Sequence, residues 1–561
     1  MIRKRIGTLS LFVLLAALAA LFTMATALSV TDFLQLIFPA ESDMPAIASN
    51  DANPVLKLLQ KVYVVLIAQG PQRALVLYAV LLLGVYGMKN VFSYSAVVTY
   101  ARFKISVLGE LRNRIHNAAM RQDFAGWSSQ QQGQWLSVMS SDMTEYETNV
   151  LEALSLLLQA LLTMVIYVTM LLYLDWKLTL IVVAVMGLGT LLLSASRRLK
   201  RQSRYLQDLN GQLMTTIQET LDSLKEIKAA AAIPFVNRRQ REQNAKFSRR
   251  RISIYRRIDA ASPLSDFMGN TIVVVILIIG AIRVLGDNAT LTPAMFISYI
   301  MIYVLLLTPI KDLSNALAQL KKGKGVEERI ADKISENGER RTENGERKTE
   351  NGINSIELRD VSFGYGDVDV LSSMSVQIAM HRHTAVVGES GSGKTTFGRL
   401  LVGLLEPREG AVLINGEVCD AHTRRGRIAY IPQEPMLFND TLEENIRFGR
   451  PWVTAQQIDD AIKMAQVEQI AAQLPEGVRT VIGDGGGRLS GGERQRVSIA
   501  RALVGNPEVI VMDEATAALD AETEQRFIDS LQASMGNRTL IVIAHRASTI
   551  ARCDVKLRIQ R

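Results

Sequence analysis

The sequence predicts two domains, an all-α transmembrane domain of six helices followed by an α/β domain. Three observations predict this division. Charged residues are sparse before position 320 and dense after it, in a chain of 561 residues with a mean hydropathy of +0.14. Apolar runs long enough to cross a bilayer recur in the first half. In the second half, a glycine-rich loop precedes an apolar strand that ends in two carboxylates.

Six apolar stretches are candidates for membrane-spanning helices, because each approaches the roughly 20 residues that cross a bilayer. They cover residues 6–30, 74–100, 154–174, 178–194, 264–285 and 293–309. Only residues 175–177 separate the third stretch from the fourth. Basic residues at positions 3–5 place the amino terminus inside the cell, and the basic segments 102–121 and 197–257 then fall on the same side. Six crossings also return the carboxyl terminus to the cytoplasm.

The first apolar stretch has an alternative interpretation as a cleavable secretory signal, because basic residues precede it and Ala25-Thr26-Ala27 resembles a cleavage site. The apolar run continues to Val30, which is longer than a usual signal core. Cleavage would leave five spans, an awkward number for a self-packed bundle. We therefore expect a retained span.

The cytoplasmic segments 102–150 and 197–261 have a helical composition and are longer than connectors require. The sequence predicts that the spanning helices continue into water and form hairpins. Their tips lie near residues 126–132 and 225–234. One interpretation is that the tips are solvated and have no further role. We expect instead that they dock on the α/β domain.

A polar tandem repeat separates the two halves, since Glu-Asn-Gly recurs at positions 336, 343 and 350. With no apolar positions to bury, it predicts a flexible tether. The expected domains are therefore residues 1–320, which span the membrane, a linker at 321–352 and the α/β domain at 353–561.

The net charge of +8 does not indicate nucleic-acid binding, because much of the excess lies between apolar runs in segment 197–257. The two cysteines, Cys419 and Cys553, lie in the α/β half without metal-ligand spacing. They predict no disulfide framework and suit a reducing cytosol.

The phosphate-binding loop follows the apolar strand that ends at Val387. Its glycines let backbone N–H groups converge on phosphate oxygens at a helix amino terminus. Lys394 supplies a charge for the β- and γ-phosphates of ATP, and the Thr395 hydroxyl is a ligand for Mg²⁺. The candidate ATP-binding residues of the loop are Gly388, Glu389, Ser390, Gly391, Ser392, Gly393, Lys394, Thr395 and Thr396.

The strand at residues 509–513 ends in adjacent carboxylates. Asp513 would hold Mg²⁺ through water, and Glu514 would polarise the water that attacks the γ-phosphate. The loop, the strand and their order predict nucleotide binding. Between them lies Leu489-Ser490-Gly491-Gly492-Glu493, a segment that a nucleotide-binding domain alone does not require.

With these motifs the chain resembles the ATP-binding cassette (ABC) family of P-loop NTPases, specifically exporter-type half-transporters, over nearly its whole length. The resemblance implies that Tyr365 stacks on adenine, although a strand aromatic in the core is the alternative. It implies that Gln433 senses Mg²⁺ and touches the membrane half. It also implies that the signature Leu489, Ser490, Gly491, Gly492 and Glu493 binds the γ-phosphate held by a partner.

The same resemblance assigns Asp520 to a loop that crosses the dimer interface, and His545 to a catalytic switch beside Glu514 and Lys394. Two departures from the family pattern stand out. Glu493 replaces the usual Gln, which puts little in doubt. Ala517 stands where Ser is frequent, which removes one hydrogen-bonding group from the interface loop.

A single cassette with six spans is half of the machine that the resemblance implies. Because Ser490, Glu514 and His545 are all present, the chain can supply both halves of a competent site, which favours a homodimer over a heterodimer. Closure of the cassettes on two ATP molecules would tilt the spans from inward-facing to outward-facing, and hydrolysis would reset them.

The cargo is the least determined feature. Polar residues inside spans are the candidates to contact it, namely Lys89, Asn90 and Asn270, although a lysine near a span end often extends to the interface instead. We expect a bacterial cell-membrane exporter of a lipid, drug-like or other amphipathic molecule, with its cassette in the cytoplasm. The alternatives are an importer on the exporter scaffold, as for siderophores, a peptide exporter, and a soluble ABC ATPase that acts on DNA or ribosomes, against which the spans argue.

Overall fold

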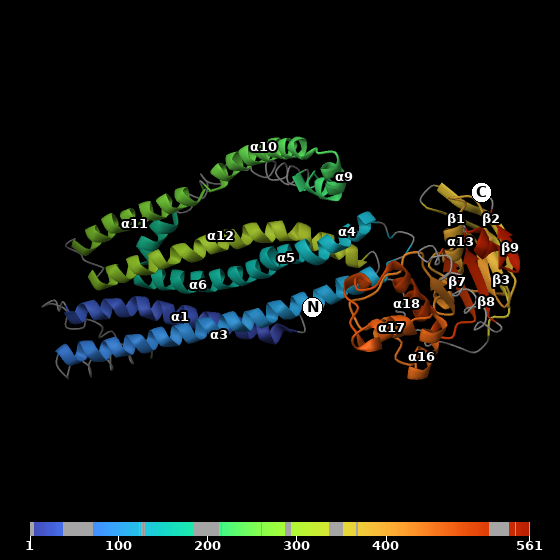
Figure 1. The fold of residues 1–561 in the computed structure, drawn as a ribbon. Coiled ribbons are helices and arrows are strands. Elements are labelled where there is room, and N and C mark those ends of the chain that lie inside the picture. The colour runs from blue at the N-terminus through green and yellow to red at the C-terminus, as the bar shows by residue number, and fades with distance from the viewer. Residues whose placement is uncertain are drawn as a thin grey trace. The chain divides into compact units, whose positions relative to one another are not determined.

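The computed structural model describes residues 5–37, 71–122, 124, 127, 129–184, 213–214, 216–259, 261–285, 293–335, 352–365, 368–514, 538–544 and 546–559. The chain divides into two compact units, which Figure 1 shows in the colours of the sequence. Unit 1 comprises Met1–Asn117 and Leu136–Ser335. Unit 2 comprises Ala118–Trp135 and Glu336–Arg561.

The described residues of unit 1 are helical apart from short turns at Asp175, Ser223 and residues 230–232. Two of its helices are far longer than a bilayer requires, with 50 residues in α3 and 43 in α12, so each extends beyond a membrane span as expected. The bounds are α1 (Ile6–Ile37), α3 (Pro71–Met120), α4 (Ser129–Ser137, shared with unit 2), α5 (Met143–Tyr146), α6 (Ala153–Leu174), α9 (Leu224–Ala229), α10 (Ile233–Asp259), α11 (Ala261–Leu285) and α12 (Pro293–Ser335).

Four helices of the described part are long and apolar enough to cross a membrane, at Ile6–Ser29, Leu75–Met120, Gln132–Leu174 and Met295–Ser335. They contain the predicted first, second, third and sixth spans almost entirely. A shorter apolar helix, Gly269–Leu285, lies within the predicted fifth span. The predicted fourth span is helical as far as residue 184, and the remainder lies outside the described residues.

Two π-helical stretches, η3 (Val138–Asp142) and η4 (Glu147–Glu152), interrupt the helix that runs from α4 through α5 to α6. The backbone at their caps stays in the right-handed helical region, so the helix is continuous. Helix α12 lies against η4 at Gly323, where an added Cβ would be 2.9 Å from the carbonyl oxygen of Asn149. The sequence analysis did not predict these π-helical turns.

The membrane half of unit 1 has its core among α1, α6, α11, α12 and the helical residues 176–184. Asp175 makes a tight turn in the short segment between the third and fourth predicted spans, because its carboxylate accepts hydrogen bonds from the backbone N–H groups of Lys177 and Leu178 at 2.9 and 3.0 Å. Its other oxygen pairs with Arg283 of α11. Fully buried core side chains include Leu178, Ile276, Tyr299, Ile302 and Tyr303.

Residues 321–335 are helical, which corrects the expectation that a flexible linker begins at 321. The physical reason is packing. Val326 and Ile330 are spaced by four residues on one helix face and are 2% and 3% exposed. The rest of the predicted linker, with the exception of residue 352, lies outside the described residues.

Unit 2 contains two sheets (Figure 1). One is antiparallel with the order β2-β1-β4-β5, and the other is parallel with the order β6-β7-β8-β3-β9. The strands are β1 (Ile356–Tyr365), β2 (Val368–Ile378), β3 (His383–Val387), β4 (Glu409–Ile414), β5 (Glu417–Val418), β6 (Ile428–Ile431), β7 (Val509–Asp513), β8 (Thr539–Ile543) and β9 (Val555–Arg558).

Helices cover the parallel sheet, which is the α/β arrangement that the sequence predicts. They are α13 (Lys394–Leu401), α14 (Ala421–Arg424), α15 (Leu442–Arg447), α16 (Ala455–Met464), α17 (Glu468–Gln473), α18 (Gly491–Leu503) and α20 (Ala547–Ala551), with 3-10 turns η5 (Gly477–Arg479) and η6 (Asp484–Gly486).

Strand β7 is buried on both faces, which explains its uninterrupted apolar sequence. Val509 and Val511 belong to the core that the two sheets share, whereas Ile510 and Met512 belong to the core under α15–α18. Alternate side chains therefore anchor the strand to two cores, which holds its carboxyl end firmly in place.

Candidate functional site

The phosphate loop lies between β3 and α13, as predicted. Gly391 and Gly393 have φ angles of 81° and 93°, a left-handed conformation that favours glycine. A Cβ on Gly393 would also lie 2.9 Å from the Leu371 side chain. Lys394, which is 6% exposed, donates from Nζ to the carbonyl oxygens of Gly388 and Glu389 at 2.9 and 2.7 Å. These bonds curl the loop around the lysine.

The loop fits a polyphosphate. The Ser392 hydroxyl is buried and has no hydrogen-bond partner among the described residues, so it is free for a ligand oxygen. Among the described residues, Lys394 donates to carbonyl oxygens, which a phosphate can replace with a stronger, charge-assisted bond. The loop precedes the amino terminus of α13, where the helix dipole favours an anion.

The candidate magnesium ligands come together. Asp513 ends β7 and is 2% exposed. Its Oδ1 accepts a hydrogen bond from the Thr395 hydroxyl at 3.1 Å, across 118 residues of sequence. One hydroxyl and one carboxylate are the hard oxygen donors that Mg²⁺ prefers, so this pair fits the metal that the sequence implies.

Glu514 and Gln433 are also neighbours. The Gln433 side-chain amide donates to Glu514 Oε2 at 3.0 Å. Glu514 has a φ of 47°, an uncommon conformation for a residue other than glycine, and its N–H donates to the Ile543 carbonyl at 3.1 Å. Strained backbone of this kind clusters at functional sites. The structure therefore brings together the residues predicted to polarise water and to sense Mg²⁺.

Tyr365 ends β1 and is 40% exposed, so it is not the core aromatic of the alternative interpretation. Its ring lies edge-on to Phe363, with centroids 5.2 Å apart. Arg399 of α13 approaches the Tyr365 hydroxyl at 3.5 Å. An exposed ring beside the phosphate-loop helix remains available for stacking.

The signature segment begins α18. Ser490 is the N-cap of the helix and forms a capping box with Glu493. Glu493 Oε2 accepts hydrogen bonds from the backbone N–H and the hydroxyl of Ser490 at 2.7 and 2.8 Å. Leu489 is buried, which anchors the segment. Glu493 thus fulfils the capping role that the usual Gln can also fill.

Two predicted positions, Asp520 and His545, lie outside the described residues, as does Ala517. The candidate cargo residues lie on two helices. Lys89 is half-buried and Asn90 exposed on α3, and Asn270 is exposed on α11.

The sequence analysis missed two residues of this site. Tyr430 of β6 donates its hydroxyl to Asp513 Oδ2 at 2.9 Å. Arg399 interacts with the hydroxyls of Tyr365 and Tyr430, and the Phe124 ring lies 5.2 Å from its guanidinium. Phe124 belongs to the hairpin segment within unit 2, so this contact agrees with the expected docking of the first tip.

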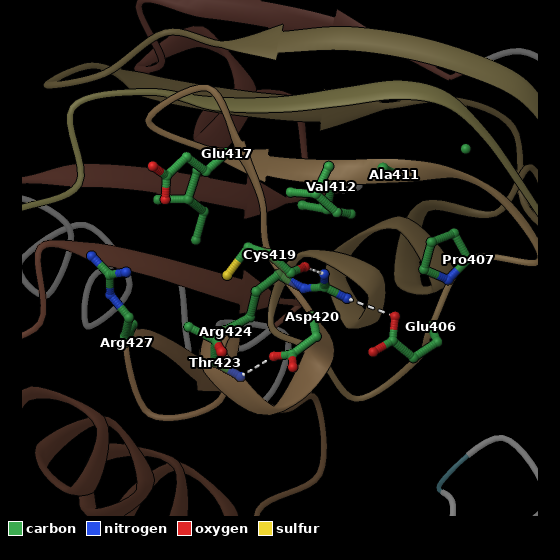
Figure 2. A pocket seen from close by; sticks show the side chains of 13 residues that line it. Glu406, Pro407, Ala411, Val412, Glu417, Cys419, Asp420, Thr423, Arg424 and Arg427 are labelled. Carbon is green, nitrogen blue, oxygen red and sulfur yellow. Dashed lines mark hydrogen bonds and ion pairs between the residues drawn. The ribbon is translucent and has the colours of Figure 1, made fainter. Parts of the chain in front are cut away.

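A separate cavity of about 450 Å³ lies beside β4, β5 and α14 (Figure 2). Arg424 is 1% exposed there and donates to the carbonyl oxygens of Cys419 and Leu405. It also pairs with Glu406 at 3.6 Å. No residue predicted from the sequence as a site residue lines this cavity. Its buried charge, the Arg424 guanidinium, is bonded to the protein's own carbonyl oxygens and to Glu406.

Comparison with known proteins agrees with this geometry. Residues 371–517 match the family described as "ABC transporter", and residues 9–310 match "ABC transporter transmembrane region". The second match alone covers more than half of the chain.

The chain belongs to the ABC transporter family.

Several curated relatives of this ABC transporter are named "ATP-dependent lipid A-core flippase". The protein from Syntrophus aciditrophicus is 30% identical over 84% of this chain and 78% of its own length. The one from Desulfotalea psychrophila is 29% identical over 84% and 82%. The one from Burkholderia pseudomallei is 33% identical over 70% and 66%.

Among solved structures, a bacterial Atm1-family ABC exporter with ATP bound has a similar fold, with a TM-score of 0.73 and 23% identity, over 100% of this chain and 93% of that one. This transporter is therefore a membrane protein that fuses a helical transmembrane domain to an ATP-hydrolysing cassette, as the sequence predicted.

Proposed function

We propose that this ABC transporter is one half of an ATP-driven exporter that moves a lipid or another amphipathic molecule across the bacterial inner membrane. The observation that carries the proposal is the cluster of Thr395, Asp513, Gln433 and Glu514 around a loop shaped for phosphate. The names of the relatives support a lipid cargo, with lipid A-core as the first candidate.

The residues divide the work of hydrolysis. Lys394 would exchange its two carbonyl partners for the β- and γ-phosphates of ATP, while Tyr365 would stack on adenine. Thr395 and Asp513 would hold Mg²⁺, which neutralises phosphate charge when bound. Glu514 would accept a proton from the attacking water, and the amide of Gln433 keeps that carboxylate oriented.

The signature supports a dimer as the working form. Ser490 is exposed, and among the described residues its side chain bonds with Glu493, within its own helix, so a second chain can reach this serine. We propose a homodimer in which each Ser490 closes on the ATP of the other chain, with Asp520 and His545 completing the interface and the switch. In the most apolar 18-residue stretch of α3, 6% of the residues are buried within the single chain. The rest of this stretch is exposed and offers surface to lipid and to the second copy.

Closure of the two cassettes would tilt the spans from inward-facing to outward-facing, and hydrolysis would reset them. The basic segments 102–121 and 197–257 support an orientation with the cassette in the cytoplasm. Lys89, Asn90 and Asn270 remain the proposed cargo contacts. Lys89 suits an anionic head group, because it is half-buried on a spanning helix.

The test is reconstitution in lipid vesicles with ATP on the cassette side. We expect lipid A-core or a related amphipathic molecule to stimulate hydrolysis and to move to the opposite leaflet. The Glu514→Gln variant should bind ATP but lose most of its turnover, by about 100-fold or more. Movement toward the cassette side would establish an importer instead, and full turnover by Glu514→Gln would contradict the assignment of the base.

A further inference from the structure

Tyr430 contacts the magnesium carboxylate from the neighbouring strand. In the parallel sheet Tyr430 pairs with Val511, and Asp513 follows two residues later along β7. Because side chains alternate along a strand, Val511 and Asp513 share one face, and Tyr430 reaches the carboxylate from beside them. Its hydroxyl donates to Oδ2 at 2.9 Å, while Thr395 donates to Oδ1 at 3.1 Å. Both oxygens of a carboxylate that is 2% exposed are therefore engaged.

The direction of the Tyr430 hydrogen bond is determined by its surroundings. The Asp513 carboxylate carries no proton in its ionised form, so its oxygens only accept hydrogen bonds. Arg399 also interacts with this hydroxyl and carries only donors. The phenol proton must consequently point to Asp513.

Arg399 extends the cluster to the edge of the site. Its guanidinium reaches the Tyr365 hydroxyl at 3.5 Å and lies 5.2 Å from the Phe124 ring. The proposed adenine platform, the hairpin segment and the magnesium carboxylate therefore meet through one arginine and one tyrosine.

We infer that Tyr430 is a positioning residue for Asp513, and that Arg399 orients Tyr430. The inference rests on the proposed Mg²⁺ site at Thr395 and Asp513. With its Oδ2 tied to Tyr430, the carboxylate keeps Oδ1 directed at Thr395, so the two metal ligands are arranged before the metal arrives. Groups that hold a metal ligand in this way typically change metal affinity or activity by about 10–100-fold when they are removed.

The experiment measures Mn²⁺ binding by electron paramagnetic resonance, with the full-length protein in lipid nanodiscs and a non-hydrolysable ATP analogue. Tyr430→Phe removes only the hydroxyl. We expect its Mn²⁺ affinity to fall by about 10–100-fold, while binding of the analogue in EDTA stays unchanged. The EDTA measurement shows that the variant is folded and that its adenine and phosphate contacts are intact.

A matched pair tests the role of Arg399. Arg399→Met should lower Mn²⁺ affinity in the same direction as Tyr430→Phe, and adding Arg399→Met to Tyr430→Phe should produce little further loss. Arg408 is half-exposed and pairs with Asp369 on β2, so Arg408→Met is the control and should bind Mn²⁺ like the wild type.

Two failures are distinguishable. If the wild type bound neither the analogue nor Mn²⁺ with it, the proposed function would be wrong and the inference would fall with it. If the wild type bound both and Tyr430→Phe bound Mn²⁺ within about twofold of it, only the positioning role would be overturned. Unequal, additive losses from the two substitutions would overturn the link between Arg399 and Tyr430.

Discussion

Arg329 on α12 holds the carboxylate of Asp142 with two nitrogen atoms, Nε to Oδ2 at 3.2 Å and Nη2 to Oδ1 at 2.8 Å. Asp142 is the last residue of the π-helical stretch η3 and is buried. On α3, Lys104 pairs with Glu147 and Glu152, the two ends of η4, at 2.8 and 3.1 Å. Basic side chains on α12 and α3 therefore form ion pairs with both π-helical stretches. The π-helical conformation is often found at functional positions.

Loss of the pair between Arg329 and Asp142 should destabilise unit 1. Arg329→Met leaves a buried carboxylate without its bidentate partner, so we expect a loss of about 1–2 kcal/mol, reduced from the fully buried case because Arg329 is half-exposed. Thermal unfolding in detergent, with Asp142→Asn and the double variant, measures the coupling. Arg238→Met removes an exposed pair with Glu242 and should change stability by less than about 0.5 kcal/mol. Equal effects from Arg329→Met and Arg238→Met would contradict the importance of the buried partner.

Two glycines of α12 should respond oppositely to the same substitution. An added Cβ at Gly323 would lie 2.6 Å from Val150 Cγ2 and 2.9 Å from the Asn149 carbonyl oxygen, whereas Gly325 has open space around it. Gly325→Ala should stabilise the helix by up to about 1 kcal/mol, because alanine is the better helix former. Gly323→Ala should lower the unfolding temperature despite the same gain. If both variants became more stable, α12 and η4 would not be in close contact in solution.

Replacement of Ser490 should separate folding from function. Ser490→Ala removes a capping-box hydroxyl and should cost about 1 kcal/mol of cassette stability. Thr454 forms an equivalent capping box with Gln457 at the start of α16, so Thr454→Ala should cost a similar amount. Only Ser490→Ala should weaken ATP-dependent association of two chains, which crosslinking or light scattering can follow. Equal association by the two variants would argue against the signature role.

The thiols should react slowly with maleimide at neutral pH. Burial raises the pKa of both Cys419 and Cys553 above the ordinary value, so the reactive thiolate is scarcer than in a free peptide. Because the pKa is raised, the labelling rate should keep rising with pH beyond the point at which the rate of a free thiol levels off. With Cys553→Ser, the rate at Cys419 can be compared with that of glutathione between pH 7 and 10. A rate at pH 7 that matched glutathione would show that Cys419 is not buried in solution.

Local patterns explain how much of the site could be predicted. The phosphate loop, the acidic end of β7 and the start of α18 are each contiguous, so spacing along the chain reveals them. Tyr430 could not be found in this way, because 83 residues separate it from Asp513 and only the pairing of β6 with β7 brings them together. A tyrosine in an apolar strand otherwise resembles any core aromatic.

The membrane half shows the same limit. Hydropathy located the first, second, third and sixth predicted spans, and helical composition predicted that helices such as α3 and α12 are longer than a span. It did not indicate where α12 ends, because the segment after residue 320 is polar on all but one face. Val326 and Ile330 on that face are buried in the fold, which the composition of the segment does not reveal. The π-helical stretches also contact residues far along the chain, namely Gly323, Lys104 and Arg329, which a local pattern does not reveal.

The left-handed backbone at Glu514 has a consequence for how this domain can change. A glycine at that position would relax the strand end, since non-glycine residues in such a conformation cost on the order of 1–3 kcal/mol. Selection for thermal stability alone would therefore favour glycine in place of Glu514, and the cassette would lose its proposed proton acceptor. The more stable cassette would then be one that no longer hydrolyses ATP.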